Sequence, residues 1–193
     1  MFRVDNFRQS LELPNVTVLP EERKEAEAEY KKLYSAEPVL NNLTVHKKEE
    51  SRFAGIIGEL VFQRLYPKAG RVSLIDPGCP YDFKYIYEKV DVKCKVRTNA
   101  PKLEYEGSFF AYQLDELKRL DVLLYFMSTT KEFDRIWLCG YMPTVGFMNH
   151  PRLQVWQEGE IDQSNGKKYH AKTYGLAYEH MYPVNVNKIQ KWL

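Results

Sequence analysis

The stretch YDFKYIYEKVDVKCKVR, residues 81–97, decides the fold because apolar and polar side chains alternate along it. In its second half, apolar residues at even positions alternate with charged residues at odd positions: Val90, Asp91, Val92, Lys93, Cys94 and Lys95. Alternation with a period of two is typical of β-strands, whose successive side chains point to opposite faces. We therefore predict two strands joined near residues 87–89 as a β-hairpin.

The polar face of this predicted hairpin carries two carboxylates and a lysine. Asp91 and Lys93 share that face about 6.5 Å apart, and Asp82 on the preceding strand can point to the same side. Two carboxylates brought together repel each other, so a positive charge must compensate. Lys93 supplies part of this positive charge. A bound Mg²⁺ ion, which takes one or two protein carboxylates as ligands, could supply the remainder. The alternative is a solvent-facing hairpin with an exposed salt bridge, which contributes little to stability.

Glu59 adds a third carboxylate. The segment SRFAGIIGELVFQRLY, residues 51–66, has apolar residues at helical spacing, and Glu59 stands within it. An acid among core-facing residues is unusual, so we expect Glu59 to act at a metal directly or through water. The alternative is an acid on the solvent-facing side of the helix. Gly55 and Gly58 weaken a helix, and they predict that another backbone or a ligand approaches closely there.

The remaining sequence predicts an α/β fold. We expect a surface helix over residues 21–38, a short helix at 114–120, and strands at 71–75, 108–112, 121–127, 135–142 and 168–174. Residues 121–127 are apolar on both faces, which indicates a central strand, and Gly140 indicates a bulge or a close approach. This order predicts a central mixed β-sheet flanked by helices. We expect one compact domain, in which an N-terminal arm and surface helix (1–50) and a C-terminal extension (143–193) flank a core (51–142).

Composition narrows the function. The 193 residues carry a net charge of +2, which neither demands nor excludes a nucleic-acid partner. Three cysteines without CxxC spacing predict reduced thiols, and four scattered histidines argue against a zinc site. The absence of GxxxxGK[ST] and GxGxxG motifs argues against an ATPase or a dinucleotide enzyme. The amino-terminal sequence has no apolar run typical of a signal peptide, so we expect a cytoplasmic location.

Three motifs together resemble the PD-(D/E)xK nuclease superfamily, which includes restriction endonucleases, junction resolvases and phage exonucleases. These motifs are Glu59 on the first core helix, Pro80-Tyr81-Asp82, and Asp91-Val92-Lys93. The sequence departs from the common pattern because Tyr81 separates the proline from Asp82, and because Asp91 stands where glutamate is commoner. The resemblance covers about residues 51–142 and implies a restriction-endonuclease-like core with the element order αβββαβ.

The resemblance also implies a role for each motif residue. Asp82 and Asp91 would hold Mg²⁺ or Mn²⁺ together with the backbone carbonyl of Val92, and Glu59 would bind the metal or its water shell. Lys93 would orient the attacking water or help to deprotonate it. The metal would lower the pKa of this water and stabilise the charge of the transition state. The implied enzyme is an endo- or exonuclease that hydrolyses DNA, with RNA also open as a substrate, in a cellular or a phage setting.

Four basic residues near the motifs are candidates for contacts with DNA phosphates. They are Arg52, Lys95, Arg97 and Lys102. The alternative for them is a solvated basic surface. Because nucleases that cut both strands are often dimers, the resemblance leaves a homodimer open. A second class of function also stays open, in which a nuclease-like fold with weak or no catalysis binds nucleic acid or serves as a structural subunit.

Overall fold

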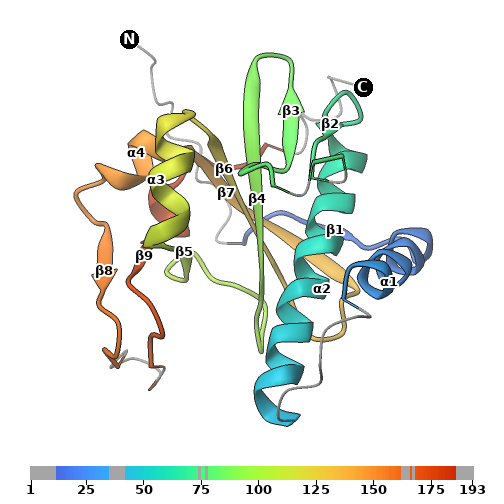
Figure 1. The fold of residues 1–193 in the computed structure, drawn as a ribbon, viewed down its shortest axis with the longest axis horizontal. Helices are drawn as coiled ribbons and strands as arrows, with labels where there is room; N and C mark the ends of the chain where they lie inside the picture. Colours follow the sequence, from blue (N-terminus) through green and yellow to red (C-terminus); the bar gives the residue numbers. More distant parts are fainter. Residues whose placement is uncertain are drawn as a thin grey trace.

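A curled six-stranded mixed sheet lies at the centre of the computed structural model (Figure 1). The structure describes residues 12–34, 42–73, 75–76, 78–161, 166 and 168–185, without the side chains of residues 42–48 and 115. The sheet contains β1 (Asn15–Thr17), β2 (Gly70–Arg71), β3 (Phe83–Tyr85), β4 (Glu88–Val96), β6 (Leu123–Thr129) and β7 (Arg135–Pro143), in the order β1-β7-β6-β4-β3-β2. β4 and β6 pair in parallel, and the other neighbours pair antiparallel. The predicted mixed α/β fold is confirmed at this level.

The predicted hairpin is present as β3 and β4. Phe83 pairs with Val90 and Tyr85 pairs with Glu88, so residues 86–87 form the connecting loop. The predicted central strand is also confirmed, because β6 lies between β4 and β7. Gly140 has a φ of 147°, and the register of β6 and β7 shifts beside it. The irregularity predicted from this glycine is therefore confirmed.

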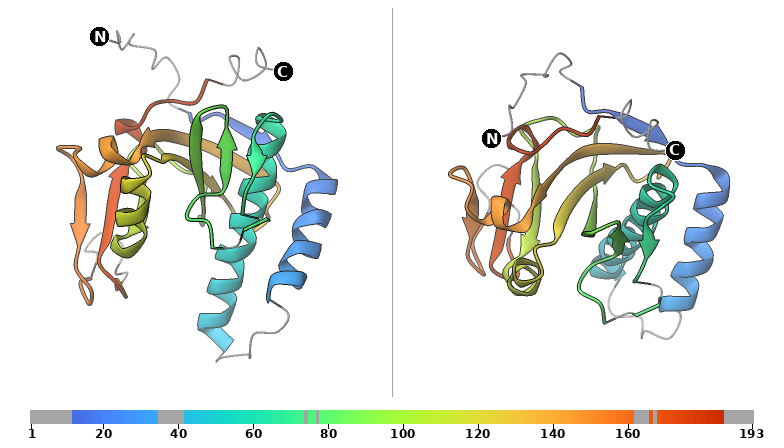
Figure 2. Two further views of the ribbon diagram at one scale, coloured as in Figure 1. Left: turned by 45° about the horizontal axis from the view of Figure 1, so that its top comes forward. Right: turned by 90° about the horizontal axis from the view of Figure 1, so that it is seen from above.

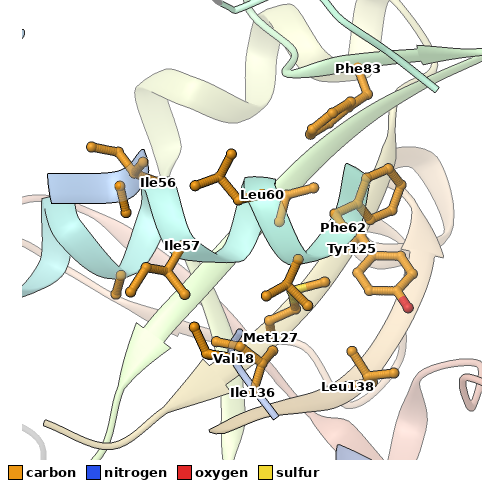
Figure 3. Packing of buried hydrophobic residues seen from close by; sticks show 14 of the residues in the cluster. Val18, Ile56, Ile57, Leu60, Phe62, Phe83, Tyr125, Met127, Ile136 and Leu138 are labelled. Carbon is orange, nitrogen blue, oxygen red and sulfur yellow. The ribbon is translucent and has the colours of Figure 1, made fainter. Parts of the chain in front are cut away.

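Helix α2 (Asn42–Leu65) packs against β4, and α1 (Pro20–Tyr34) packs against α2. The buried side chains between α2 and the sheet are shown in Figure 3 and include Ile57, Leu60 and Phe83. A Cβ atom at Gly58 would lie 2.7 Å from Cys94 Cβ, so the missing side chain lets α2 approach β4. The predicted close approach is confirmed at Gly58 and is wrong at Gly55, where no atom lies within 4 Å of a Cβ position.

A second sheet with the order β5-β9-β8 was not predicted. It consists of β5 (Glu106–Phe110), β8 (Gln154–Trp156) and β9 (Thr173–Ala177). Together with α3 (Ala111–Arg119), α4 (Thr144–Met148) and a 3₁₀ turn (Tyr178–His180), it surrounds a second cluster of buried residues that includes Phe109 and Phe126. Figure 2 shows α1 and α2 at one end of the main sheet, and α3, α4, β8 and β9 at the other.

Several predicted boundaries are wrong. The helix predicted from residue 51 begins at Asn42, the strand predicted at 71–75 covers only Gly70–Arg71, and the late strand predicted at 168–174 lies at Thr173–Ala177. Within the predicted flanking segments, residues 1–11, 35–41 and 186–193 lie outside the described residues. Among the helices of the described ranges, none has the length and apolar character needed to cross a membrane.

Candidate metal centre

Asp82 lies directly before the first residue of β3, and its carboxylate continues the hydrogen bonding of the β3–β4 ladder. The Asp82 backbone N–H donates to the carbonyl of Val90 over 3.0 Å. Asp82 Oδ2 then accepts a hydrogen bond of 2.7 Å from the backbone N–H of Val92. In a strand, the N–H and C=O of one residue point to the same side. The carbonyl of Val92 therefore lies on the same edge of β4 as the Asp82 carboxylate.

Asp91 lies on β4 with only 3% of its surface exposed. Its Oδ1 accepts a hydrogen bond of 3.0 Å from Lys93 Nζ. Its Oδ2 is buried and has no hydrogen-bond partner in the described part of the chain. A buried carboxylate oxygen left unpaired costs free energy, and metal coordination is one way to satisfy such an atom.

Both carboxylates are destabilised in their charged form. Burial, followed by the negative charges of Asp91 and Glu59, holds the pKa of Asp82 well above its usual range. Burial also raises the pKa of Asp91, although Lys93 opposes this shift. A proton or a bound cation relieves this destabilisation. The pair therefore has the electrostatics expected of a cation site.

Lys93 carries its positive charge into this group. Burial lowers the pKa of Lys93, but the attraction of Asp91, Asp82 and Glu59 outweighs burial, so that the pKa is raised overall. Lys93 is therefore an ammonium ion at neutral pH. Its Nζ lies 5.3 Å from the ring centroid of Phe109 on β5, within the range of a cation–π contact. The second sheet thus helps to position the lysine.

Glu59 lies close enough to Asp82 and Lys93 to affect both pKa values, but one of its oxygens is already occupied. Glu59 Oε2 accepts hydrogen bonds from Arg71 Nε at 2.8 Å and from Ser73 Oγ at 2.9 Å. Arg71 also donates two hydrogen bonds of 2.8 Å to Glu29 on α1. Arg71 and Ser73 were missed in the sequence because their partners are distant along the chain and no local pattern marks them.

The charges of this group leave room for a divalent cation. Four carboxylates, at Glu29, Glu59, Asp82 and Asp91, face two cations, Arg71 and Lys93. With every group ionised, the balance is two negative charges. No three His, Cys, Asp or Glu side chains within the described ranges are placed to hold a metal together. A site here would use two carboxylates and a backbone carbonyl, a donor set that Mg²⁺ accepts when water completes its coordination.

Two of the predicted phosphate-binding residues have protein partners. Lys95 Nζ donates to Glu106 Oε1 at 3.0 Å and to Ser108 Oγ at 3.2 Å, both on β5. Arg97 donates to the Glu106 carbonyl at 2.6 Å and to the Tyr178 hydroxyl at 3.1 Å. Both side chains therefore join β4 to the second sheet and its 3₁₀ turn. A role for them at phosphates stays a prediction.

The other two predicted phosphate-binding residues are Arg52 on α2 and Lys102 in the segment between β4 and β5. The Arg52 guanidinium stacks over the Tyr34 ring at 4.1 Å, which places it between α2 and α1. Lys102 is exposed and lies 3.8 Å from Glu104. A contact of Arg52 or Lys102 with DNA also stays a prediction.

Comparisons with known proteins add no family to this geometry. No protein-family model matches the chain, and a search of curated proteins found no match.

Proposed function

We propose that this protein is a Mg²⁺- or Mn²⁺-dependent nuclease that hydrolyses phosphodiester bonds of DNA. The observation that carries the proposal is the pair of the half-buried Asp82, directly before β3, and the buried Asp91 on β4, with Lys93 on one oxygen of Asp91 and no partner among the described residues on the other. In this proposal the α2, β3, β4, α3 and β6 elements form a restriction-endonuclease-like core. The resemblance of the three motifs to PD-(D/E)xK nucleases supports the same assignment.

Asp82, Asp91 and the Val92 carbonyl would hold the cation. The buried Oδ2 of Asp91 fits a metal ligand because no group in the described ranges of the chain satisfies it. When bound, the cation supplies Lewis-acid stabilisation of phosphate charge and makes water more acidic. The hydrogen bond from the Val92 N–H fixes Asp82 in place before any ligand arrives, so the residues need little rearrangement on binding.

Lys93 would stabilise negative charge on the substrate phosphate. An ammonium ion cannot accept a proton, and the neighbouring carboxylates keep Lys93 in this form. It can donate hydrogen bonds to a phosphate oxygen and to a water molecule beside it. Lys93 therefore acts in this proposal as an orienting and charge-stabilising group, and not as a base.

Glu59 would act as a positioning residue behind the two aspartates. Its ion pair with Arg71 fixes its side chain, and its charge raises the pKa of both Asp82 and Lys93. The negative charge of Glu59 therefore favours the state in which Asp82 and Asp91 hold a cation over the state in which they hold none. The proposal also includes contacts between DNA phosphates and the four basic residues predicted from the sequence, which are Arg52, Lys95, Arg97 and Lys102. It further includes a homodimer in solution.

Cleavage assays with matched variants test the proposal. Purified protein should cut plasmid or oligonucleotide DNA with Mg²⁺ or Mn²⁺ and not with EDTA. Asp91→Ala and Lys93→Ala should reduce cleavage by at least about 100-fold, the scale on which loss of a transition-state contact acts. The exposed residues Asp121 and Lys118 provide the controls Asp121→Asn and Lys118→Ala. A protein that binds DNA and cuts neither DNA nor RNA with either metal would favour the binding-subunit alternative.

A further inference from the structure

The loop that joins β3 to β4 exposes two large side chains to solvent. Ile86 is 63% exposed and Tyr87 is 95% exposed. This loop lies at the upper extremity of the described ribbon in Figure 1, away from the second sheet. Neither residue belongs to either cluster of buried side chains. Packing among the described residues therefore gives no reason for this pair.

The backbone of this loop is also unfavourable for the residue it carries. Ile86 has a φ of +54°. This region favours glycine, asparagine and aspartate, and it is strained for a β-branched residue. Strain that persists without a packing reason often marks a functional segment. Glycine at position 86 would remove the strain, so the isoleucine side chain stands there at a cost in stability.

A pair of lysines separates the loop from the candidate metal centre. Lys84 on β3 lies directly opposite Lys89 on β4. Like charges at opposed positions destabilise a strand pair. Lys89 is two residues from Asp91, so strand alternation places both lysines on the face that carries Asp91. This face therefore leads from the aspartates over two positive charges to the exposed loop.

The distance from the aspartates to the loop can be expressed in base-pair steps of a nucleic-acid duplex. The four residue-to-residue steps from Asp82 to Ile86 cover about 13 Å at the rise of a β-strand. The same length holds about four base-pair steps of 3.4 Å. With the hairpin lying along the duplex axis, a phosphate at Asp82 and Asp91 would be followed by phosphates toward Lys84 and Lys89, and the loop would meet the duplex about four base pairs away.

We propose that Ile86 and Tyr87 insert between base pairs of duplex DNA and unstack them about four base pairs from the cleaved phosphate. This inference rests on the proposed function for the position of the phosphate. Apolar side chains can part base steps in this way, and a tyrosine ring can stack on the base that is released. The lysine pair favours a polyanion as the occupant.

A double variant tests the role of the loop. Ile86→Gly combined with Tyr87→Ser removes both side chains, and glycine suits the positive φ, so the hairpin is kept. The variant should unfold at the same or a higher urea concentration than the wild type. Leu33→Ser, at an exposed apolar residue on α1, is the matched control.

Two measurements separate this inference from the proposed function. The first is the fluorescence of 2-aminopurine at successive positions of a DNA duplex, with Ca²⁺ in place of Mg²⁺, which reports unstacking without cleavage. Wild type and Leu33→Ser should raise the emission, and the double variant should not. The second is cleavage: the variant should cut a duplex at least about tenfold more slowly and a duplex with a preformed mismatch at nearly the wild-type rate.

The outcomes divide cleanly. Unstacking without cleavage would support the loop's role and overturn the nuclease. Cleavage without unstacking, or equal loss on both duplexes, would overturn the loop's role and leave the nuclease. Wild-type protein that neither binds nor cuts would overturn both. Loop-dependent binding to anionic vesicles, with no loop-dependent effect on DNA, would also overturn the inference.

Discussion

The carboxylate of Asp82 accepts a 2.7 Å hydrogen bond from the backbone N–H of Val92, between the two residues Asp91 and Lys93. This contact holds the half-buried Asp82 beside the buried Asp91 although the two carboxylates are of like charge. A backbone donor cannot move away as a flexible side chain can. The two aspartates are therefore preorganised at the expense of stability, as is common at functional sites.

Asp82→Asn should stabilise the metal-free protein. The amide oxygen can still accept from Val92, while the charge that burial, Asp91 and Glu59 disfavour is removed. We expect the free energy of unfolding in EDTA to rise by about 1 kcal/mol. Urea titration measures this, with Asp121→Asn as the exposed control. Mg²⁺ should stabilise the wild type and not Asp82→Asn; a variant that is less stable in EDTA would contradict the electrostatic account.

Arg71→Gln should destabilise the protein strongly. Arg71 is buried and bonds Glu29 and Glu59 at the same time, so its loss leaves two carboxylates without their cation. Breaking a buried pair from one side costs about 3–5 kcal/mol. Arg119→Gln removes an arginine from an exposed pair with Glu116 and should change stability by less than about 0.5 kcal/mol. Adding Glu29→Gln to Arg71→Gln should recover part of the loss.

Two glycines of α2 should respond to alanine with opposite signs. A Cβ at Gly58 would meet Cys94 at 2.7 Å and force α2 away from β4, at a cost of about 1–3 kcal/mol. Gly55 has open space, so Gly55→Ala should stabilise the helix by up to about 1 kcal/mol. Because Glu59 follows Gly58, Gly58→Ala should also slow cleavage. Equal effects of the two substitutions on urea unfolding would show that α2 does not approach β4 closely.

Glu106 should contribute to stability only above acidic pH. Burial raises its pKa, but the charge and hydrogen bond of Lys95, a backbone hydrogen bond and the charge of Arg97 together outweigh burial, so that the net shift is downward. Its contribution is therefore complete above the unfolded-state pKa of about 4.3 and is lost as the pH falls through the lower folded-state value. Glu106→Gln should lower the free energy of unfolding by about 1 kcal/mol at pH 7, and the difference should shrink as the pH falls below the unfolded-state pKa. Glu104→Gln, in an exposed pair, should show no such dependence.

Local sequence patterns predicted the parts of the structure that depend on neighbouring residues. Alternation over residues 81–97 predicted β3 and β4, and apolar residues on both faces predicted that β6 is central. Asp91 and Lys93 could be placed on one face by the same reasoning, and the structure joins them by a hydrogen bond. The burial of Asp91 could not be predicted, because it depends on packing from elements distant in sequence.

The missed features all depend on long-range contacts. β5 pairs with β9, which lies more than 60 residues later in the chain. No local sequence pattern specifies which of the distant strands will pair with β5. Arg71 is similar: its two partners lie on α1 and α2, so its position can be recognised only in the folded chain. Lys95 and Arg97 continue the polar face of β4 as predicted, yet β5 and the 3₁₀ turn supply their partners.

The most direct test of the central claim is a crystal structure of the protein soaked in Mn²⁺, with anomalous scattering to locate the metal. The account predicts an anomalous peak between the carboxylates of Asp82 and Asp91, in contact with Asp91 Oδ2, and no peak there in Asp91→Ala. Absence of that peak at a Mn²⁺ concentration that supports cleavage, or a peak at a different group of residues, would contradict it.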